Sequence, residues 1–95
     1  RIFPLIYRVS PYIQYRRLLS PVQWQLLIAI AKEERVFQPQ SKAFLAKYKI
    51  GTPANSKRAL EALLDKEMIF KEEDLRNSWY QVYDVFLSRW LQLTF

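Results

Sequence analysis

Residues 41–72 read SKAFLAKYKIGTPANSKRALEALLDKEMIFKE, and this stretch decides the fold. A short amphipathic helix is expected over residues 42–49, because apolar side chains recur there at helical spacing. A turn at Gly51 follows, and a second helix is expected from Thr52 through Asp65. Two short helices joined by a tight turn have the spacing of a helix-turn-helix, which presents its second helix for docking against a partner.

Helix caps support these boundaries. Ser20, Ser41 and Thr52 each stand where a hydroxyl oxygen can accept a backbone N–H of a first turn, and proline follows the first and the third. Gln23 completes a capping box with Ser20. Gly51 is the only glycine, and it is expected to be the left-handed C-cap of the first helix of the motif, where a side chain would clash.

Further elements are expected on both sides of the motif. A helix over residues 20–35 precedes it, followed by a short extended piece that ends at Pro39 and suits an edge strand, because proline cannot donate to a ladder. Residues 68–72 and 79–83 are β-rich runs joined by a polar loop, which predicts a hairpin. Asp84 then caps a closing helix whose apolar positions are Phe86, Leu87, Trp90 and Leu91. The predicted fold is mainly α (α+β): a winged helix-turn-helix with a three-helix core, a small antiparallel β-hairpin wing and a C-terminal helix.

The composition bounds the chemistry. The chain has 95 residues, 51% of them hydrophobic, which is enough for one domain with a single core. Without cysteine it can form neither a disulfide nor a thiolate metal site, and without histidine it lacks the commonest general base and metal ligand. No run approaches the roughly 18 apolar residues of a membrane span, and we expect a cytoplasmic protein. Because the chain begins at Arg1 rather than methionine, we expect a piece of a longer protein.

The net charge of +6 is unevenly distributed. Residues 1–19 carry four arginines and no acid, whereas residues 20–95 carry eleven basic and nine acidic residues. Residues 42–58 form a basic block, but residues 61–74 carry six acids and two lysines. One edge of the helix-turn-helix can therefore neutralise phosphates, while the adjoining hairpin mostly repels them.

Three blocks of the sequence resemble the winged-helix domain that ends many prokaryotic P-loop AAA+/STAND-type ATPases. They are LSPVQWQLLIAIA at residues 19–31, IGTP with RALEAL between residues 50 and 63, and YQVYDVFLSRWL at residues 80–91, the last being the most specific. The resemblance covers about residues 19–92. It departs at Ser56, where a family member more often has an apolar residue.

The resemblance implies a division of the chain and a missing neighbour. Residues 1–18 would be the connector or tail of a preceding lid domain, and residues 19–95 the winged helix-turn-helix domain. An ATPase core with ATP and Mg²⁺ would precede both. This chain holds no cofactor site for them, because a glycine-rich phosphate loop cannot be built from one glycine. We expect a non-enzymatic module.

Two sets of residues are candidates for contacts. Double-stranded DNA would be contacted by Lys42, Lys49, Asn55, Lys57, Arg58 and Arg76, at the positions where a helix-turn-helix and its wing reach bases and phosphates. The alternative for these six is an ordinary solvated surface. Trp24 and Ile28 lie one turn apart on a separate face of the first helix, and they either cover the edge of the core or contact another domain.

Three functions therefore stay open. The domain either binds DNA, or regulates its own ATPase and lid domain or another protein partner without binding DNA, or is a stand-alone DNA-binding domain of a transcription factor. Self-association through residues 1–19 would follow from cutting the chain. The acids Glu72, Glu73 and Asp74 are expected to be solvated rather than a cation site, and the aromatic residues of the hairpin and last helix to be packing rather than a base-stacking platform.

Overall fold

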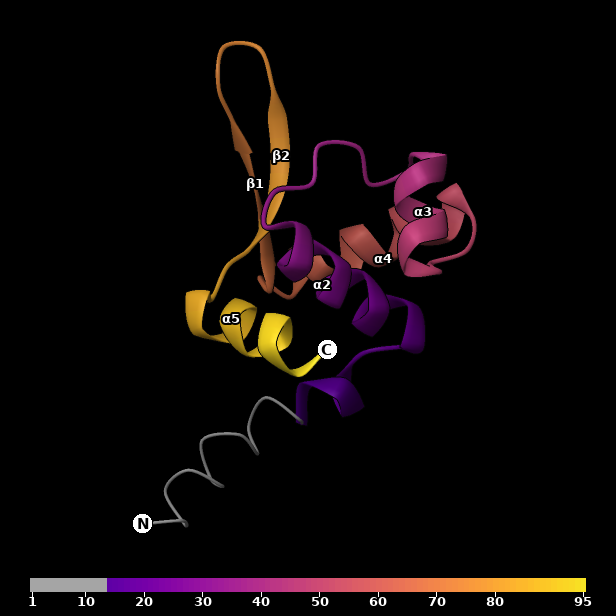
Figure 1. The fold of residues 1–95 in the computed structure, drawn as a ribbon, viewed down its shortest axis with the longest axis vertical. Helices are drawn as coiled ribbons and strands as arrows, with labels where there is room; N and C mark the ends of the chain where they lie inside the picture. Colours follow the sequence, from indigo (N-terminus) through magenta and orange to yellow (C-terminus); the bar gives the residue numbers. More distant parts are fainter. Residues whose placement is uncertain (1–13) are drawn as a thin grey trace.

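The structure is a computed structural model that describes residues 14–95 (Figure 1). Residues 14–18 are helical, and the expectations that concern residues 1–13 lie outside the described residues. The elements that follow are α2 (Pro21–Glu33), α3 (Lys42–Tyr48), α4 (Pro53–Asp65), β1 (Ile69–Glu73), β2 (Ser78–Val82) and α5 (Val85–Thr94). This order, with three helices, an antiparallel hairpin and a closing helix, confirms the predicted fold class.

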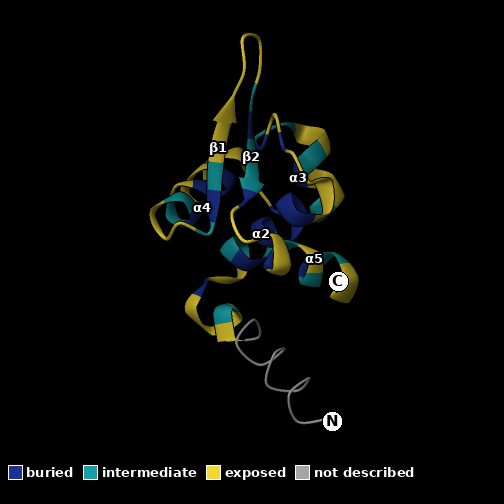
Figure 2. Cartoon of the chain, turned by 90° about the vertical axis from the view of Figure 1, so that its left-hand side faces the viewer, coloured by how far each residue is buried: buried dark blue, intermediate teal, exposed yellow. Residues whose placement is uncertain are grey.

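Helix α2 is the centre of the molecule, and the other elements pack around it. Ser20 and Gln23 form the expected capping box, with bonds of 3.2 Å in both directions. Residues 26–31 are all buried, so the helix is covered on nearly every side rather than along one stripe (Figure 2).

Burial distinguishes the two alternatives for Trp24 and Ile28, and both residues cover the core. Each is only 6% exposed. The ring of Phe95, at the end of the chain, packs edge-on against Trp24 with centroids 5.7 Å apart, and Ile28 belongs to the core cluster. The end of the closing helix therefore covers Trp24.

The helix-turn-helix forms where it was expected, but its turn differs. Ser41 and Thr52 cap α3 and α4, accepting the backbone N–H of Phe44 at 3.3 Å and of Asn55 at 3.2 Å. The left-handed cap of α3 is Lys49, with φ 54° and ψ 46°, and not Gly51. Gly51 has φ +106°, and an added Cβ would meet only the Asn55 amide nitrogen at 3.7 Å. Glycine is favoured there by the backbone conformation and not by lack of space.

The wing has strands of the expected length, but both lie one residue nearer to its tip than predicted. Strands β1 and β2 pair antiparallel from Ile69 with Val82 to Glu73 with Ser78, so each run is shifted by one residue from the predicted range. Val36 bridges Tyr80 on the other edge of β2, with backbone bonds of 3.0 and 2.9 Å. The extended piece before Pro39 is thus an edge segment, as predicted.

Two residues tie neighbouring segments to this frame. Ser56 is fully buried at the start of α4, and its hydroxyl donates to the Pro39 carbonyl at 2.8 Å, so the polar group that departs from the family pattern is satisfied. Leu19 is buried in the core and Tyr15 packs against it. The segment before α2 therefore contacts the body of the molecule, while the proposed boundary at residue 19 stays a prediction.

Candidate functional site

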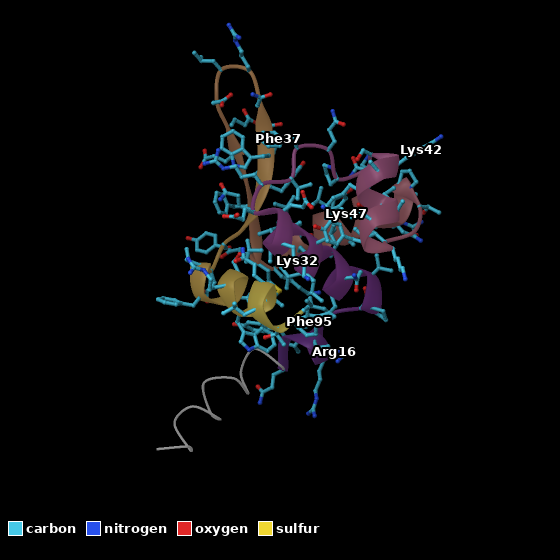
Figure 3. The ribbon with its side chains drawn as sticks, viewed as in Figure 1. Arg16, Lys32, Phe37, Lys42, Lys47 and Phe95 are labelled. Carbon is cyan, nitrogen blue, oxygen red and sulfur yellow. The ribbon has the colours of Figure 1, made fainter. Side chains whose placement is uncertain are left out.

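Four cations and one amide lie on α3, the turn and α4, and we call them the basic edge: Lys42, Lys49, Asn55, Lys57 and Arg58. All five are exposed. Lys42 opens α3 and points into solvent at the outer end of that helix (Figure 3), and Lys49 is its C-cap. Within residues 14–95 none of the four cations forms an ion pair, so each is available to a partner.

The first two turns of α4 bring part of this set together. Asn55 and Arg58 line a shallow hollow of about 220 Å³, whose opposite wall is the start of α2 with Ser20, Val22 and Gln23. Neither α2 nor α4, whose first turns line the hollow, has an acidic residue there, so the partial positive charge of both helix N-termini adds to that of Arg58. The hollow therefore favours an anionic group.

The same helix turns acidic further along. Glu61 and Asp65 are exposed on α4, one and two turns after Lys57. A phosphate backbone lying along the whole helix would be attracted at its beginning and repelled at its end. The geometry thus suits contact with the N-terminal half of α4 alone.

A fifth cation of the region is already engaged. Lys47 donates to the Glu33 carboxylate at 2.8 Å, and the Tyr48 hydroxyl donates to the same oxygen. The hydrogen bond from Lys47, and then the one from Tyr48, lower the pKa of the Glu33 carboxyl. The pKa of Tyr48 is raised, first by burial and then by its bond to Glu33. This cluster joins the end of α2 to α3 and does not belong to the basic edge.

Arg76 lies at the tip of the wing, which projects away from the helices (Figure 1), and is therefore separate from the other candidates. The Asp74 carboxylate accepts the backbone N–H groups of Arg76 at 2.9 Å and Asn77 at 2.7 Å, and these bonds lower its pKa. Leu75 beside them is fully exposed. Asp74 thus shapes the turn that presents Leu75 and Arg76.

The aromatic residues of the wing mostly pack, as expected. Trp79 is 8% exposed, with Phe37 beside it at 5.7 Å between centroids and the Arg35 guanidinium 4.9 Å from its ring centre. Tyr83 is different, since it is 66% exposed at the end of the hairpin. No group of acidic side chains in the described part of the chain could hold a metal ion.

Sequence reasoning missed an apolar surface on α5. Phe86, one of the expected apolar positions of this helix, is 77% exposed, and Val85 and Leu93 are 67% and 82% exposed. The signal was present, because VFLSRWLQLT has apolar residues on every face and too few polar ones to cover the side away from the core. Such a surface on a small domain points to contact with another molecule.

The comparisons with known proteins agree with this fold. No helix among the described residues is long and apolar enough to cross a membrane. No curated protein matches the chain. A family model described as "Probable winged helix domain" matches residues 10–93, which is most of the sequence and includes every element named above except the last residue of α5. The chain therefore belongs to the family of probable winged helix domains.

Proposed function

We propose that this winged helix domain binds double-stranded DNA through the basic edge, by contacts to phosphates rather than to a particular base sequence. The observation that carries the proposal is the set of four exposed cations on α3, the turn and the first half of α4, none of which has an acidic partner among residues 14–95. Winged helix domains are typically non-enzymatic and commonly bind DNA or proteins.

The chemistry of the basic edge fits a phosphate backbone. Lysine and arginine gain affinity by releasing the cations condensed on DNA, and this gain is independent of sequence. Asn55 and Arg58 stand at the N-terminus of α4, where a base edge or a phosphate would approach the hollow. Arg76 at the wing tip adds a second point of contact to a neighbouring phosphate.

Glu61 and Asp65 limit the expected affinity for DNA. Their carboxylates lie on the same helix and oppose phosphate, so we expect micromolar affinity with a steep dependence on salt. The parent protein is a prokaryotic, cytoplasmic AAA+/STAND-like ATPase in this proposal, with the ATP and Mg²⁺ site in the region that precedes this chain. The support for that parent is the resemblance of residues 19–31, 50–63 and 80–91.

The experiment measures binding of the 95-residue chain to a generic labelled duplex by fluorescence anisotropy at about 50 and 200 mM salt. The variant Lys57→Ala/Arg58→Ala should bind all duplexes more weakly, and the slope of log affinity against log salt should fall by about two. The matched control is Lys66→Ala/Arg89→Ala, which removes one lysine and one arginine that are exposed elsewhere. Equal losses in the two variants would show that only the net charge matters and would contradict the basic edge.

Replacing the acidic residues of α4 gives an independent test of whether this helix faces the DNA. If α4 faces DNA, Glu61→Gln/Asp65→Asn should tighten binding severalfold at low salt, because it removes two repelling charges without changing shape. Unchanged affinity would mean that α4 does not lie against the duplex.

A second candidate is a regulatory module that docks on its own ATPase and lid domain without binding DNA. The exposed acids Glu61, Asp65, Glu72 and Glu73 favour it, since they lie on the helix and wing that would otherwise meet phosphates. Absence of duplex binding at about 50 mM salt would decide for this candidate.

A further inference from the structure

Three elements meet at the base of the hairpin and border a polar hollow of about 320 Å³. They are the end of α2, strand β2 and helix α5, which pack on one another there (Figure 1). The polar residues of the lining are Glu34, Gln81, Ser88, Arg89 and Gln92. None of them belongs to the basic edge or to the wing tip, so the hollow is a separate candidate site.

The two charged residues of the hollow have opposite signs and are not paired. Glu34 follows the end of α2, and Arg89 lies on α5. Both are exposed, and neither forms an ion pair within residues 14–95. Glu33 beside them is already engaged by Lys47. A free carboxylate and a free guanidinium in one hollow suit a ligand that carries one charge of each sign.

Two glutamine side chains of the hollow are each fixed at one end by a hydrogen bond to the frame. The indole Nε1–H of Trp79 donates to Gln81 Oε1 at 2.7 Å, and Gln92 Nε2 donates to the Ala31 carbonyl at 2.7 Å. The NH₂ group of Gln81 and the Oε1 of Gln92 stay available, one as a donor and the other as an acceptor. This pair complements a peptide group, which offers one acceptor and one donor.

Glu34 stands in a strained backbone conformation. Its φ is 68° and its ψ −48°. The Arg35 N–H donates to the Glu33 carbonyl at 2.7 Å, which closes a three-residue γ-turn of the rare form with positive φ. Glycine adopts positive φ easily, whereas a residue with a Cβ atom is strained there. Because such strain is concentrated at functional sites, the turn points to a use for the carboxylate of Glu34.

We propose that this hollow binds a dipeptide with free termini. The Arg89 guanidinium pairs with the terminal carboxylate, and the Glu34 carboxylate pairs with the terminal ammonium. Between them, Gln81 donates to the carbonyl of the peptide group and Gln92 accepts its N–H. The proposal goes beyond DNA binding by the basic edge and does not depend on it.

The chemistry of the lining distinguishes a dipeptide from smaller and larger ligands. A single amino acid also carries both charges, but it has no peptide group for the two amides. An internal segment of a protein has peptide groups, but it lacks the terminal charges. The volume of about 320 Å³ lies at the lower end of the roughly 300–1,000 Å³ of small-molecule sites. Both other occupants are outcomes of the test.

The experiment is an NMR titration of the isotope-labelled 95-residue chain, with glycylglycine as the probe. Glycylglycine should shift the side-chain amide signals of Gln81 and Gln92. δ-Aminovalerate has the same chain length and both charges but no peptide group, and it should bind at least about threefold more weakly. N-Acetylglycylglycine amide keeps the peptide group but has neither charge, and it should bind at least about tenfold more weakly.

Variants then locate the contact. Glu34→Gln and Arg89→Gln each remove one charge, and each should weaken glycylglycine at least about fivefold. Gln92→Met removes the amide, so it should weaken glycylglycine but leave δ-aminovalerate unchanged. The matched control is Glu67→Gln. Glu67 is also exposed and also has a positive φ, of 58°, but it lines a different hollow, so this variant should leave the affinity unchanged.

Four results would overturn the proposal. One is the absence of any shift of the two glutamine signals at about 10 mM glycylglycine. A second is equal affinity for δ-aminovalerate, which would assign the hollow to a single amino acid or another zwitterion. A third is equal affinity for the capped peptide, which would assign it to the main chain of a protein segment. The fourth is binding that survives both Glu34→Gln and Arg89→Gln.

The two proposals fail separately. Lys57→Ala/Arg58→Ala should reduce duplex binding and leave glycylglycine binding unchanged, because neither residue lines this hollow. A chain that binds no duplex can therefore still bind glycylglycine, and a chain that binds no glycylglycine can still bind the duplex.

Discussion

A single hydroxyl group joins α4 to the segment that leads into the motif. Ser56 is completely buried, and its Oγ donates to the Pro39 carbonyl at 2.8 Å. The Ser56→Ala variant leaves that buried carbonyl without its partner, so we expect a loss of about 1–2 kcal/mol in the free energy of unfolding. Urea denaturation measures this loss, with the slope m unchanged.

The control for Ser56→Ala is Ser88→Ala. Ser88 is half-buried in α5 and its side chain makes no hydrogen bond within the described residues. Both substitutions gain the same helix propensity, so the difference between them isolates the bond to Pro39. Equal stability of the two variants would mean that the hydroxyl contributes nothing beyond its volume.

At the scale of elements, the sequence could predict those features that depend on residues close together in the chain. The caps Ser20, Ser41 and Thr52 act within four residues of themselves, and all three were predicted correctly. Gly51 was assigned correctly to an unusual backbone conformation, but Lys49 takes the left-handed cap. Both residues have a positive φ, Lys49 at 54° and Gly51 at 106°, and the sequence pattern alone does not say which of them is the cap.

Which side chains of α2 and α5 are exposed could not be predicted from local patterns. The sequence left Trp24 open between the edge of the core and an interdomain contact, and it is buried. Phe86 was named only as an apolar position of the closing helix, and it is exposed. Both outcomes have one cause, because α5 packs on α2 and covers the face with Trp24, leaving its own far side uncovered. The basic edge was predictable because charged residues are rarely buried, whereas the apolar surface of α5 needed the packing to be known.

The link between α2 and α3 makes stability depend on pH at both ends of the range. The pKa of the Glu33 carboxyl is lowered by Lys47 and Tyr48, so its stabilisation is present above the unfolded-state pKa and is lost as pH falls through the folded-state pKa. The pKa values of Lys47 and Tyr48 are raised, so their stabilisation is present below the unfolded-state values and is lost as pH rises through the folded-state values.

The variant Glu33→Gln tests this link. Between roughly pH 5 and pH 9 it should melt about 1–5 °C below the wild type, a small difference because the pair is exposed to solvent. The difference in Tm should shrink in acid, where the wild-type carboxyl is protonated too. Tyr48→Phe, which removes only the hydroxyl, is the companion variant. A gap in Tm that stays constant from acid to alkali would show that the charge of Glu33 does not contribute.

At the scale of the whole molecule, Phe95 at the end of α5 covers part of α2. The ring of Phe95 packs edge-on against Trp24 at 5.7 Å and against Trp90 at 5.8 Å, and its backbone N–H donates to the Leu91 carbonyl. Phe95 is itself 46% exposed. One half-buried ring, that of Phe95, therefore covers Trp24. Trp24 could contact another domain only if that ring were displaced.

Phe95→Ala should therefore expose Trp24 without unfolding the domain. We expect a loss of about 1–2 kcal/mol, roughly half that of a fully buried phenylalanine, and a red shift of the tryptophan emission. The control is Leu93→Ala, which removes an outward-facing side chain two residues earlier and should leave the emission unchanged. If Phe95→Ala keeps the wild-type emission, the ring does not cover Trp24 in solution. Trp24 and Ile28 on α2 would then be free to contact a neighbouring domain.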